Sequence, residues 1–145
     1  MGAELAAPGA ADEVVHDRRA LTVLVRNALF RRVRLAAEER VDELGDLDGE
    51  WGWRAPRWRS VLDSYFEEHE EILLDGDARS MDYLDINVSD ERGDHVWHVR
   101  QTFRDSEGDR DFGIAADVDL DETQELGEVV FREYRVGFAE ELLGL

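Results

Sequence analysis

The chain contains no cysteine and no lysine, so all 17 of its basic residues are arginine. Without cysteine it can form no disulfide, no thiolate nucleophile and no cysteine-based zinc site. Without lysine it lacks the phosphate-binding residue of a P-loop and the amine that Schiff-base catalysis needs. The motifs G-x-S-x-G, G-x-G-x-x-G and H-E-x-x-H are missing too. We therefore expect a protein that is not an enzyme and that holds no cofactor or metal.

Acidic residues dominate the charge, because 36 Asp and Glu side chains give a formal net charge of −19. Residues 14–60 carry ten arginines and eight acids, whereas residues 61–145 carry seven arginines and 25 acids. Such acidity disfavours nonspecific binding to nucleic acid, which depends on neutralising phosphates. An arginine-bearing half joined to an acidic half suits docking on a protein partner at one face.

A chain of 145 residues with 43% hydrophobic content predicts one folded domain. Residues 1–13 show no basic region followed by an apolar run, so they predict a disordered leader and not a secretory signal. Residues 14–145 then form a single α+β domain. No apolar run approaches the roughly 20 residues that a membrane-spanning helix needs. We expect a cytoplasmic protein without a membrane partner.

The first predicted element is one long helix. From Asp12 to about Val41 there is no Pro or Gly, and apolar residues recur at helical spacing. Asp12 is the predicted N-cap, and Gly45 is predicted to end the helix.

A second helix is predicted after a loop at residues 45–54. It begins at Ala55-Pro56, because Pro is favoured in the first turn, and it ends near the acidic residues 67–71. Beyond residue 77 the hydrophobic period changes from 3.6 to 2, which indicates half-buried strands. The strands are expected at residues 84–88, 97–103, 112–120 and 127–136, followed by a short helix at 139–143.

The connections at residues 89–94 and 105–110 are polar and short, which favours antiparallel hairpins. The fold class is therefore α+β, with two N-terminal helices packed on one side of a curved four-stranded antiparallel sheet. This outline loosely resembles nuclear-transport-factor-like folds.

Two sets of residues are candidates for an interaction surface. The first is the polar side of the long helix, with Arg26, Arg31 and Arg34. The second is a segment rich in tryptophan and arginine, and both residue types are common in interface hot spots and in contacts with single-stranded nucleic acid. Packing in the core or in the loop is the structural alternative. The members of this second set are Trp51, Trp53, Arg54, Arg57 and Arg59.

A pocket is predicted from Arg32, Tyr65 and His69. Arg32 falls on the buried side of its helix, where a guanidinium needs a carboxylate or carbonyl partner or else binds an anionic ligand. Tyr65 and His69 share one side of the second helix and could act as an acid–base pair, although a satisfied core histidine is the simpler interpretation. His95 and His98 are three residues apart in a strand and point to opposite faces, so they predict no metal pair.

Several segments together resemble a known but uncharacterised domain. They are LVRNALFRRVRLAA at residues 24–37, DELGDLD at 42–48, YFEEHEEI at 65–72, DGDAR at 75–79, VWHVRQ at 96–101 and DSEGDRDFGIAADVDL at 105–120. In this order they are similar to a domain of unknown function at the C-terminal end of actinobacterial DEAD/DEAH-box helicases. The resemblance runs from about Arg18 to Val136.

The resemblance implies an accessory module of an ATP-dependent superfamily-two helicase. The chain itself has no Walker A lysine and no DEAD or DEAH sequence, so neither ATPase nor helicase activity is assigned to its residues. The leading hypothesis is a noncatalytic module that binds the helicase core domains or another protein. The alternatives are a small-molecule-binding, possibly enzymatic cone and direct contact with single-stranded RNA by the Trp/Arg segment.

Overall fold

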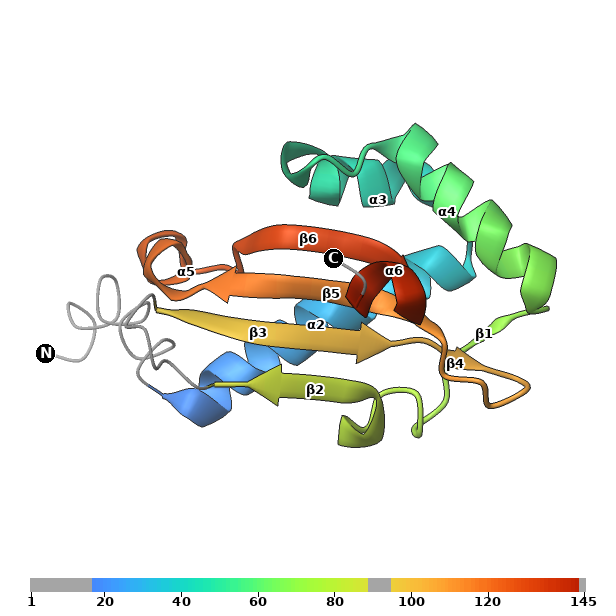
Figure 1. Ribbon diagram of the computed structural model, residues 1–145. Coiled ribbons are helices and arrows are strands. Elements are labelled where there is room, and N and C mark those ends of the chain that lie inside the picture. The colour runs from blue at the N-terminus through green and yellow to red at the C-terminus, as the bar shows by residue number, and fades with distance from the viewer. Residues whose placement is uncertain (1–16, 89–94, 144–145) are drawn as a thin grey trace, which may run out of the picture.

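A four-stranded antiparallel sheet lies in front of one long helix in the computed structural model (Figure 1). The strands occur in the order β2 (Leu84–Asn87), β3 (Val96–Thr102), β5 (Phe112–Asp119) and β6 (Phe131–Phe138). The structure describes residues 17–88 and 95–143. The predicted leader at 1–13, the predicted N-cap Asp12 and the predicted turn at 89–94 lie outside these residues.

Helices cover the back of the sheet and the edge formed by β6. Helix α2 (Arg18–Ala37) crosses behind the strands, while α3 (Val41–Asp48) and α4 (Ala55–Glu68) lie beyond β6 (Figure 1). Two short helices, α5 (Leu120–Leu126) and α6 (Ala139–Leu143), flank β6 in the chain. The predicted α+β class, with helices and an antiparallel four-stranded sheet, is confirmed.

The prediction of one long N-terminal helix is wrong, because the chain turns after Ala37. Glu39 has a φ of 56°, its N–H donates to the carbonyl of Ala36, and the N–H of Arg40 donates to the carbonyl of Leu35. This is a Schellman motif with glutamate where glycine is usual. Asp17 caps the start of α2, since its carboxylate accepts from the N–H groups of Arg19 and Ala20.

Gly45 does not end a helix, and the predicted loop at 45–54 is largely helical. Gly45 lies inside α3, which continues into the 3₁₀ turn η1 (Gly49–Trp51). A Cβ at Gly45 would stand 2.5 Å from the backbone nitrogen of Ala55. Glycine is therefore needed here for the close approach of α3 to the start of α4.

The strand predictions are confirmed in place and in antiparallel pairing, with three differences. Residues 120–126 form α5, so β6 begins at Phe131 and not at residue 127. A second, two-stranded sheet pairs β1 (Ile72–Leu73) with β4 (Arg104–Asp105). A further 3₁₀ turn, η2 (Met81–Tyr83), leads into β2. Among the described residues no helix is long and apolar enough to cross a membrane.

The core lies between α2, the inner side of the sheet and α4. Its largest fully buried side chains come from α4, β5, β6 and the residue between β3 and β4. Burial of these aromatic groups supplies much of the hydrophobic stabilisation of a domain this size. They are Trp58, Tyr65, Phe103, Phe112 and Phe131.

Candidate interaction surface and buried polar clusters

Four arginines gather on the outward side of α2, and together we call them the α2 arginine surface: Arg26, Arg31, Arg34 and Arg79. Arg79 comes from the segment after β1 and joins the helix through direct contacts. The Nε of Arg26 donates to the carbonyl of Arg79 at 3.2 Å, and the Nη2 of Arg79 donates to Oδ1 of Asn27 at 3.4 Å. Asn27 therefore links the segment to the helix.

Phe30 lies between two of these guanidinium groups. The guanidinium carbon of Arg79 is 4.8 Å from the centroid of the Phe30 ring, and that of Arg34 is 6.0 Å from it. These are cation–π distances, and they hold the two side chains against the protein. Arg31 and Arg34 are exposed. Arg34 also lies in the last turn of α2, where a positive charge is favourable.

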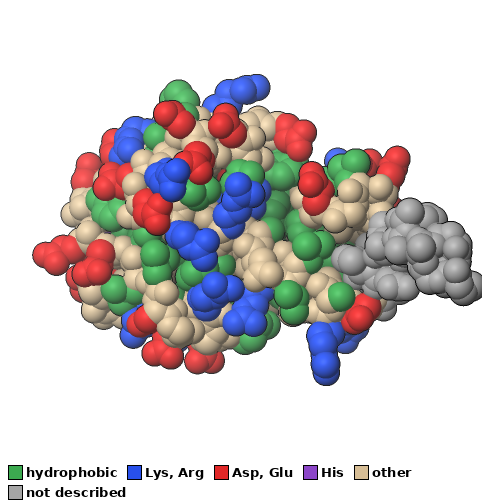
Figure 2. All heavy atoms as spheres, turned by 180° about the vertical axis from the view of Figure 1, so that it is seen from behind, with side chains coloured by type: hydrophobic (Ala, Val, Ile, Leu, Met, Phe, Trp, Pro, Cys, Tyr) green, Lys and Arg blue, Asp and Glu red, His purple; other side chains and the backbone are tan. Residues whose placement is uncertain are grey.

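Acids lie near the α2 arginine surface, since Arg31 shares a hollow with Asp46, Glu50 and Glu128, but they do not pair with it in the part of the chain that the structure describes. Within residues 17–88 and 95–143, none of its four arginines forms an ion pair with a carboxylate. Figure 2, which views the molecule from behind Figure 1, shows arginine side chains gathered across the middle of this face. In a chain with a net charge of −19, such a surface can attract an acidic partner.

The two tryptophans of the Trp/Arg segment pack inward. Trp53 is 4% exposed and its Nε1 donates to the carbonyl of Tyr134 at 3.0 Å. The Trp51 ring lies 5.5 Å from the Phe131 ring and 5.8 Å from the Tyr134 ring. Trp53 also meets Trp58 edge-on. These rings pack η1 and the start of α4 against β6. Trp53 is buried and Trp51 is partly buried, so only part of the Trp51 ring is open to a stacking base.

The three arginines of the same segment differ in their contacts. Arg57 lies with its guanidinium carbon 4.0 Å from the Trp53 ring centroid and donates to the carbonyl of Gly52. Arg59 forms ion pairs with Glu39 and Asp63. Arg54 is exposed at the start of α4. Arg54 and Arg57 are thus both exposed, but Arg57 and Arg59 are held by neighbouring groups.

Arg32 is paired inside the protein with a carboxylate. Its Nε donates to Oδ1 of Asp48 at 2.8 Å and its Nη1 donates to the carbonyl of Ala28. The other oxygen of Asp48 accepts from Trp58 Nε1 at 3.1 Å and from the Tyr134 hydroxyl at 2.8 Å. Asp48 is 0% exposed. Four elements, α2, α3, α4 and β6, are thus joined by one carboxylate.

Burial controls the titration of this cluster. Burial raises the pKa of the Asp48 carboxyl above its usual value, although Arg32 and the hydrogen bonds from Tyr134 and Trp58 oppose the rise. The pKa of Tyr134 lies well above its usual value, because the hydroxyl is buried beside Asp48. Arg32 also lies 5.1 Å from the Phe131 ring centroid. The contacts of Arg32 match the structural interpretation of this residue, and its ligand-binding role remains a prediction.

Tyr65 and His69 lie together in a second buried cluster, and they share no hydrogen-bond partner with Arg32. The two ring centroids are 4.8 Å apart, and the Tyr65 hydroxyl donates to the carbonyl of Glu71 at 2.6 Å. Burial raises the pKa of Tyr65 well above its usual value. His69 is the residue that ends α4 and is 3% exposed. The predicted pocket residues are therefore divided between two buried clusters.

Both nitrogens of His69 face carboxylates. Nδ1 lies 2.7 Å from Oε1 of Glu107, and Nε2 lies 2.9 Å from Oδ1 of Asp111. A carboxylate only accepts hydrogen bonds, so both contacts are satisfied only by the protonated imidazolium. Burial lowers the pKa of His69, but the hydrogen bonds to Glu107 and Asp111 outweigh it and the net pKa is raised.

The same region brings four potential metal ligands together. Ligand atoms of His69, Asp105, Glu107 and Asp109 lie within 4.8 Å of one another. However, the oxygens of Asp105 accept from the backbone N–H groups of Asp109 and Arg110 at 2.8 and 2.9 Å. Burial raises the pKa of Asp105, but these bonds outweigh it and lower the pKa overall. Internal hydrogen bonds thus engage His69, Asp105 and Glu107 of this cluster.

Comparison with known protein families assigns the chain to one family. The family model described as "Domain of unknown function (DUF3516)" matches residues 2–136. The chain belongs to this family. No curated protein and no solved structure matches it. The likeness of the DUF3516 domain to nuclear-transport-factor-like folds therefore remains a prediction.

Sequence reasoning missed several partners in the DUF3516 domain. Asp48 stands at a helical spacing in an acidic segment, and nothing in that segment marks it as the buried partner of Arg32. Glu107 lies in the predicted polar turn at 105–110 and Asp111 directly follows it, and most acids at such positions are solvated. Arg79 reaches α2 only through the tertiary fold. Each of these contacts joins residues at least 16 positions apart, which periodicity cannot detect.

Proposed function

We propose that this DUF3516 domain is a noncatalytic interaction module that docks on a DEAD/DEAH-box helicase core through the α2 arginine surface. One observation supports the α2 arginine surface as the docking surface. Its four arginines lie together in a strongly acidic chain without a carboxylate partner among the described residues. The helicase context rests on the resemblance of residues 24–37, 42–48 and the later segments to a helicase-associated domain.

The polar groups elsewhere in the domain support a noncatalytic role. Arg32 is held by Asp48 and by a backbone carbonyl, and His69 is held between two carboxylates. Groups bound in this way are poorly suited to accept a proton from a substrate or to bind one. The arginines on α2 are the more available donors, and guanidinium groups bind carboxylates in a well-defined bidentate geometry.

Titration of the domain against the core of a DEAD/DEAH-box helicase tests the proposal. We expect saturable binding that weakens as salt is raised from about 50 to 300 mM, because exposed ion pairs are screened over a Debye length of about 10 Å. Absence of binding at about 100 μM of each partner at low salt would contradict the proposed function.

Single-stranded RNA is the second arm of the same experiment. We expect much weaker binding to RNA than to the helicase core, because the chain carries a net charge of −19 and its Trp51 and Trp53 rings pack inward. RNA binding that is tighter than binding to the core would replace protein docking by nucleic-acid contact as the role of the α2 arginine surface.

A further inference from the structure

Two arginines lie on the side of the sheet that faces away from α2. Arg100 on β3 and Arg135 on β6 both pair with Ala115 of β5, so the three residues form one row across the sheet. Their neighbours Val99, Ile114 and Val136, which point to the other side, are buried in the core. The two arginines therefore share the outer side of the sheet.

The spacing of this row allows the guanidinium groups to approach the same point. Arg100 and Arg135 are separated by one strand, and their Cα atoms are thus about 10 Å apart. Both side chains line one hollow of about 210 Å³, together with Ala115 and with Leu142 of α6. The methyl group of Ala115 leaves the space between them open, where a larger side chain on β5 would fill it.

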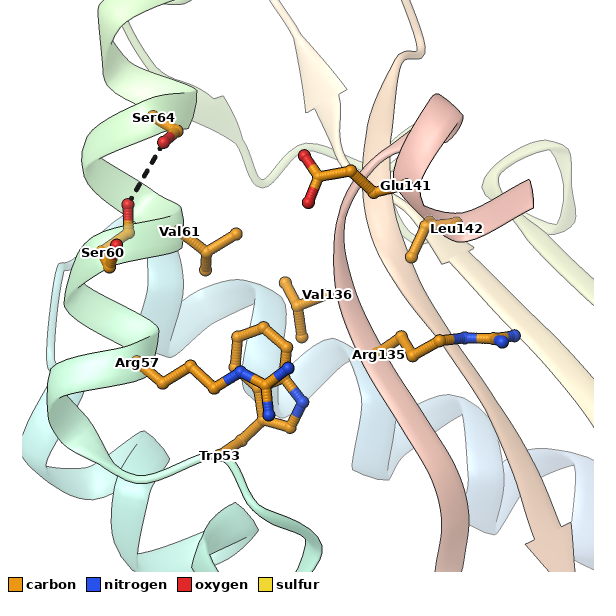
Figure 3. A pocket seen from close by; sticks show the side chains of 9 residues that line it. All are labelled: Trp53, Arg57, Ser60, Val61, Ser64, Arg135, Val136, Glu141 and Leu142. Atoms are coloured by element: carbon orange, nitrogen blue, oxygen red, sulfur yellow. Dashed lines mark hydrogen bonds between the residues drawn. The ribbon is translucent and has the colours of Figure 1, made fainter. Parts of the chain in front are cut away.

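Figure 3 shows Arg135 at the neighbouring groove between α4 and β6, which it also lines. Its side chain extends away from Trp53 and Arg57, which line the same groove. Arg57, by contrast, lies over the Trp53 ring in the same view. The guanidinium of Arg135 is therefore directed away from Trp53, and Arg135 lines both the groove and the hollow on the outer side of the sheet.

Both Nε groups lack a hydrogen-bond acceptor. The Nε atoms of Arg100 and Arg135 are buried and unpartnered, and neither side chain forms an ion pair within the described residues. Asp85, the cross-strand neighbour of Arg100, also lines the hollow, yet the two side chains form no ion pair in the part of the chain that the structure describes. Asp117 also lines the hollow, but its carboxylate is bonded to Nδ1 of His98. A buried N–H without an acceptor costs free energy, so an acceptor is expected at this point.

We infer that Arg100 and Arg135 form a binding site for a compact oxyanion, phosphate or carboxylate, on the outer side of the sheet. Each guanidinium can offer Nε–H and one Nη–H to two oxygens of the same anion. The hollow is large enough for one such group and too small for a drug-sized molecule, which needs at least about 300 Å³. This site is separate from the α2 arginine surface, which lies on the opposite side of the molecule (Figures 1 and 2).

Nitrogen-15 NMR of the arginine Nε–H groups tests the site on the intact protein. Sodium phosphate is titrated at constant ionic strength, with sodium chloride as the balancing salt. We expect two Nε–H resonances to shift and to saturate, with half-saturation at about 1 mM for two charge-assisted donors. Assignment comes from Arg100→Lys and Arg135→Lys, each of which removes one resonance while keeping the charge.

The variants also measure the contribution of each side chain. Each lysine variant should bind phosphate about tenfold more weakly, because lysine lacks the second donor of the bidentate pair. Arg57→Lys is the matched control and should bind as the wild type does, since Arg57 is held by Gly52 and Trp53.

A parallel titration with sodium acetate distinguishes the two anions, and the tighter of the two identifies the group that the site prefers. The inference is overturned if neither anion gives a saturable shift by about 20 mM, or if chloride alone reproduces it. It is also overturned if both lysine variants are folded and bind with unchanged affinity.

Discussion

Arg32 and Asp48 lie on successive helices, 16 residues apart in the chain, and form a buried ion pair with Nε and Oδ1 2.8 Å apart. The pair requires α3 to fold back along α2, and the turn at Glu39 makes this possible. Because Asp48 also accepts from Trp58 and Tyr134, its carboxylate couples the helices to β6.

Loss of one member of this pair should be strongly destabilising. Asp48→Ala removes the counter-charge of Arg32 and leaves its Nε and two other donors without an acceptor, and we expect the free energy of unfolding to fall by about 3–5 kcal/mol. Urea denaturation measures the change. The double variant Arg32→Met/Asp48→Ala should cost less than the sum of the single changes, and strict additivity would show that the two residues do not interact.

A methyl group at Gly45 should destabilise the domain even though alanine favours helices. The added Cβ would meet the backbone of Ala55 at 2.5 Å, so α3 and α4 must move apart. We expect Gly45→Ala to lower the free energy of unfolding by about 1–3 kcal/mol. Gly76→Ala is the control, because nothing lies within 4 Å of its Cβ position. Equal stability of the two variants in thermal melts would disprove the close contact.

Stability should depend on pH through His69. The pKa of His69 is raised in the folded state, so its contribution is fully present below the unfolded value of about 6.5 and is lost as pH rises through the folded value. The free energy of unfolding should therefore fall from pH 6 towards pH 9 more steeply in the wild type than in His69→Gln.

Chemical denaturation at a series of pH values measures this difference. A single proton accounts for a slope of at most about 1.4 kcal/mol per pH unit, which sets the scale of the effect. Glu68→Gln, next to His69 in the chain and exposed, is a control that removes a charge without removing the imidazolium. Parallel curves for the wild type and His69→Gln would mean that the pKa of His69 does not change on folding, and a wild-type curve that rises more with pH would mean that folding lowers it.

The sequence predicts most of the strands because their hydrophobic period is clear. Val99, Ile114 and Val136 alternate with polar or small residues and are buried as the alternation predicts. The break between α2 and α3 could not be predicted in this way, because the left-handed position is Glu39 and not glycine. Periodicity continues through the turn, and the tertiary pairing of Arg32 with Asp48 accompanies the change of direction.

The sequence contains only a weak signal for helix α5. The carboxylate of Asp119 accepts from the N–H of Glu122 at its start, and Gly127, with a φ of 76°, ends it. Both are ordinary helix boundaries, but a seven-residue helix rich in acids resembles a polar turn in sequence. The two-residue strands β1 and β4 are too short for any period to be detected.

Part of the candidate interaction surface could likewise be predicted from the sequence, and part depends on the tertiary fold. The positions of Arg26, Arg31 and Arg34 on the polar side of the helix follow from the 3.6-residue period, and Arg31 and Arg34 are exposed in the structure. The contribution of Arg79 depends on the path of the chain after β1. The inward packing of Trp51 and Trp53 depends on Tyr134, more than 80 residues away in the chain.

Charge reversal on α2 tests the central claim most directly. The affinity of the helicase core for the wild type is compared with that for Arg31→Glu/Arg34→Glu and for Arg54→Glu, an exposed arginine of the Trp/Arg segment. The account predicts that the α2 double variant binds at least about tenfold more weakly at low salt while Arg54→Glu retains its affinity. Unchanged binding by a folded α2 double variant, or a loss confined to Arg54→Glu, would contradict it.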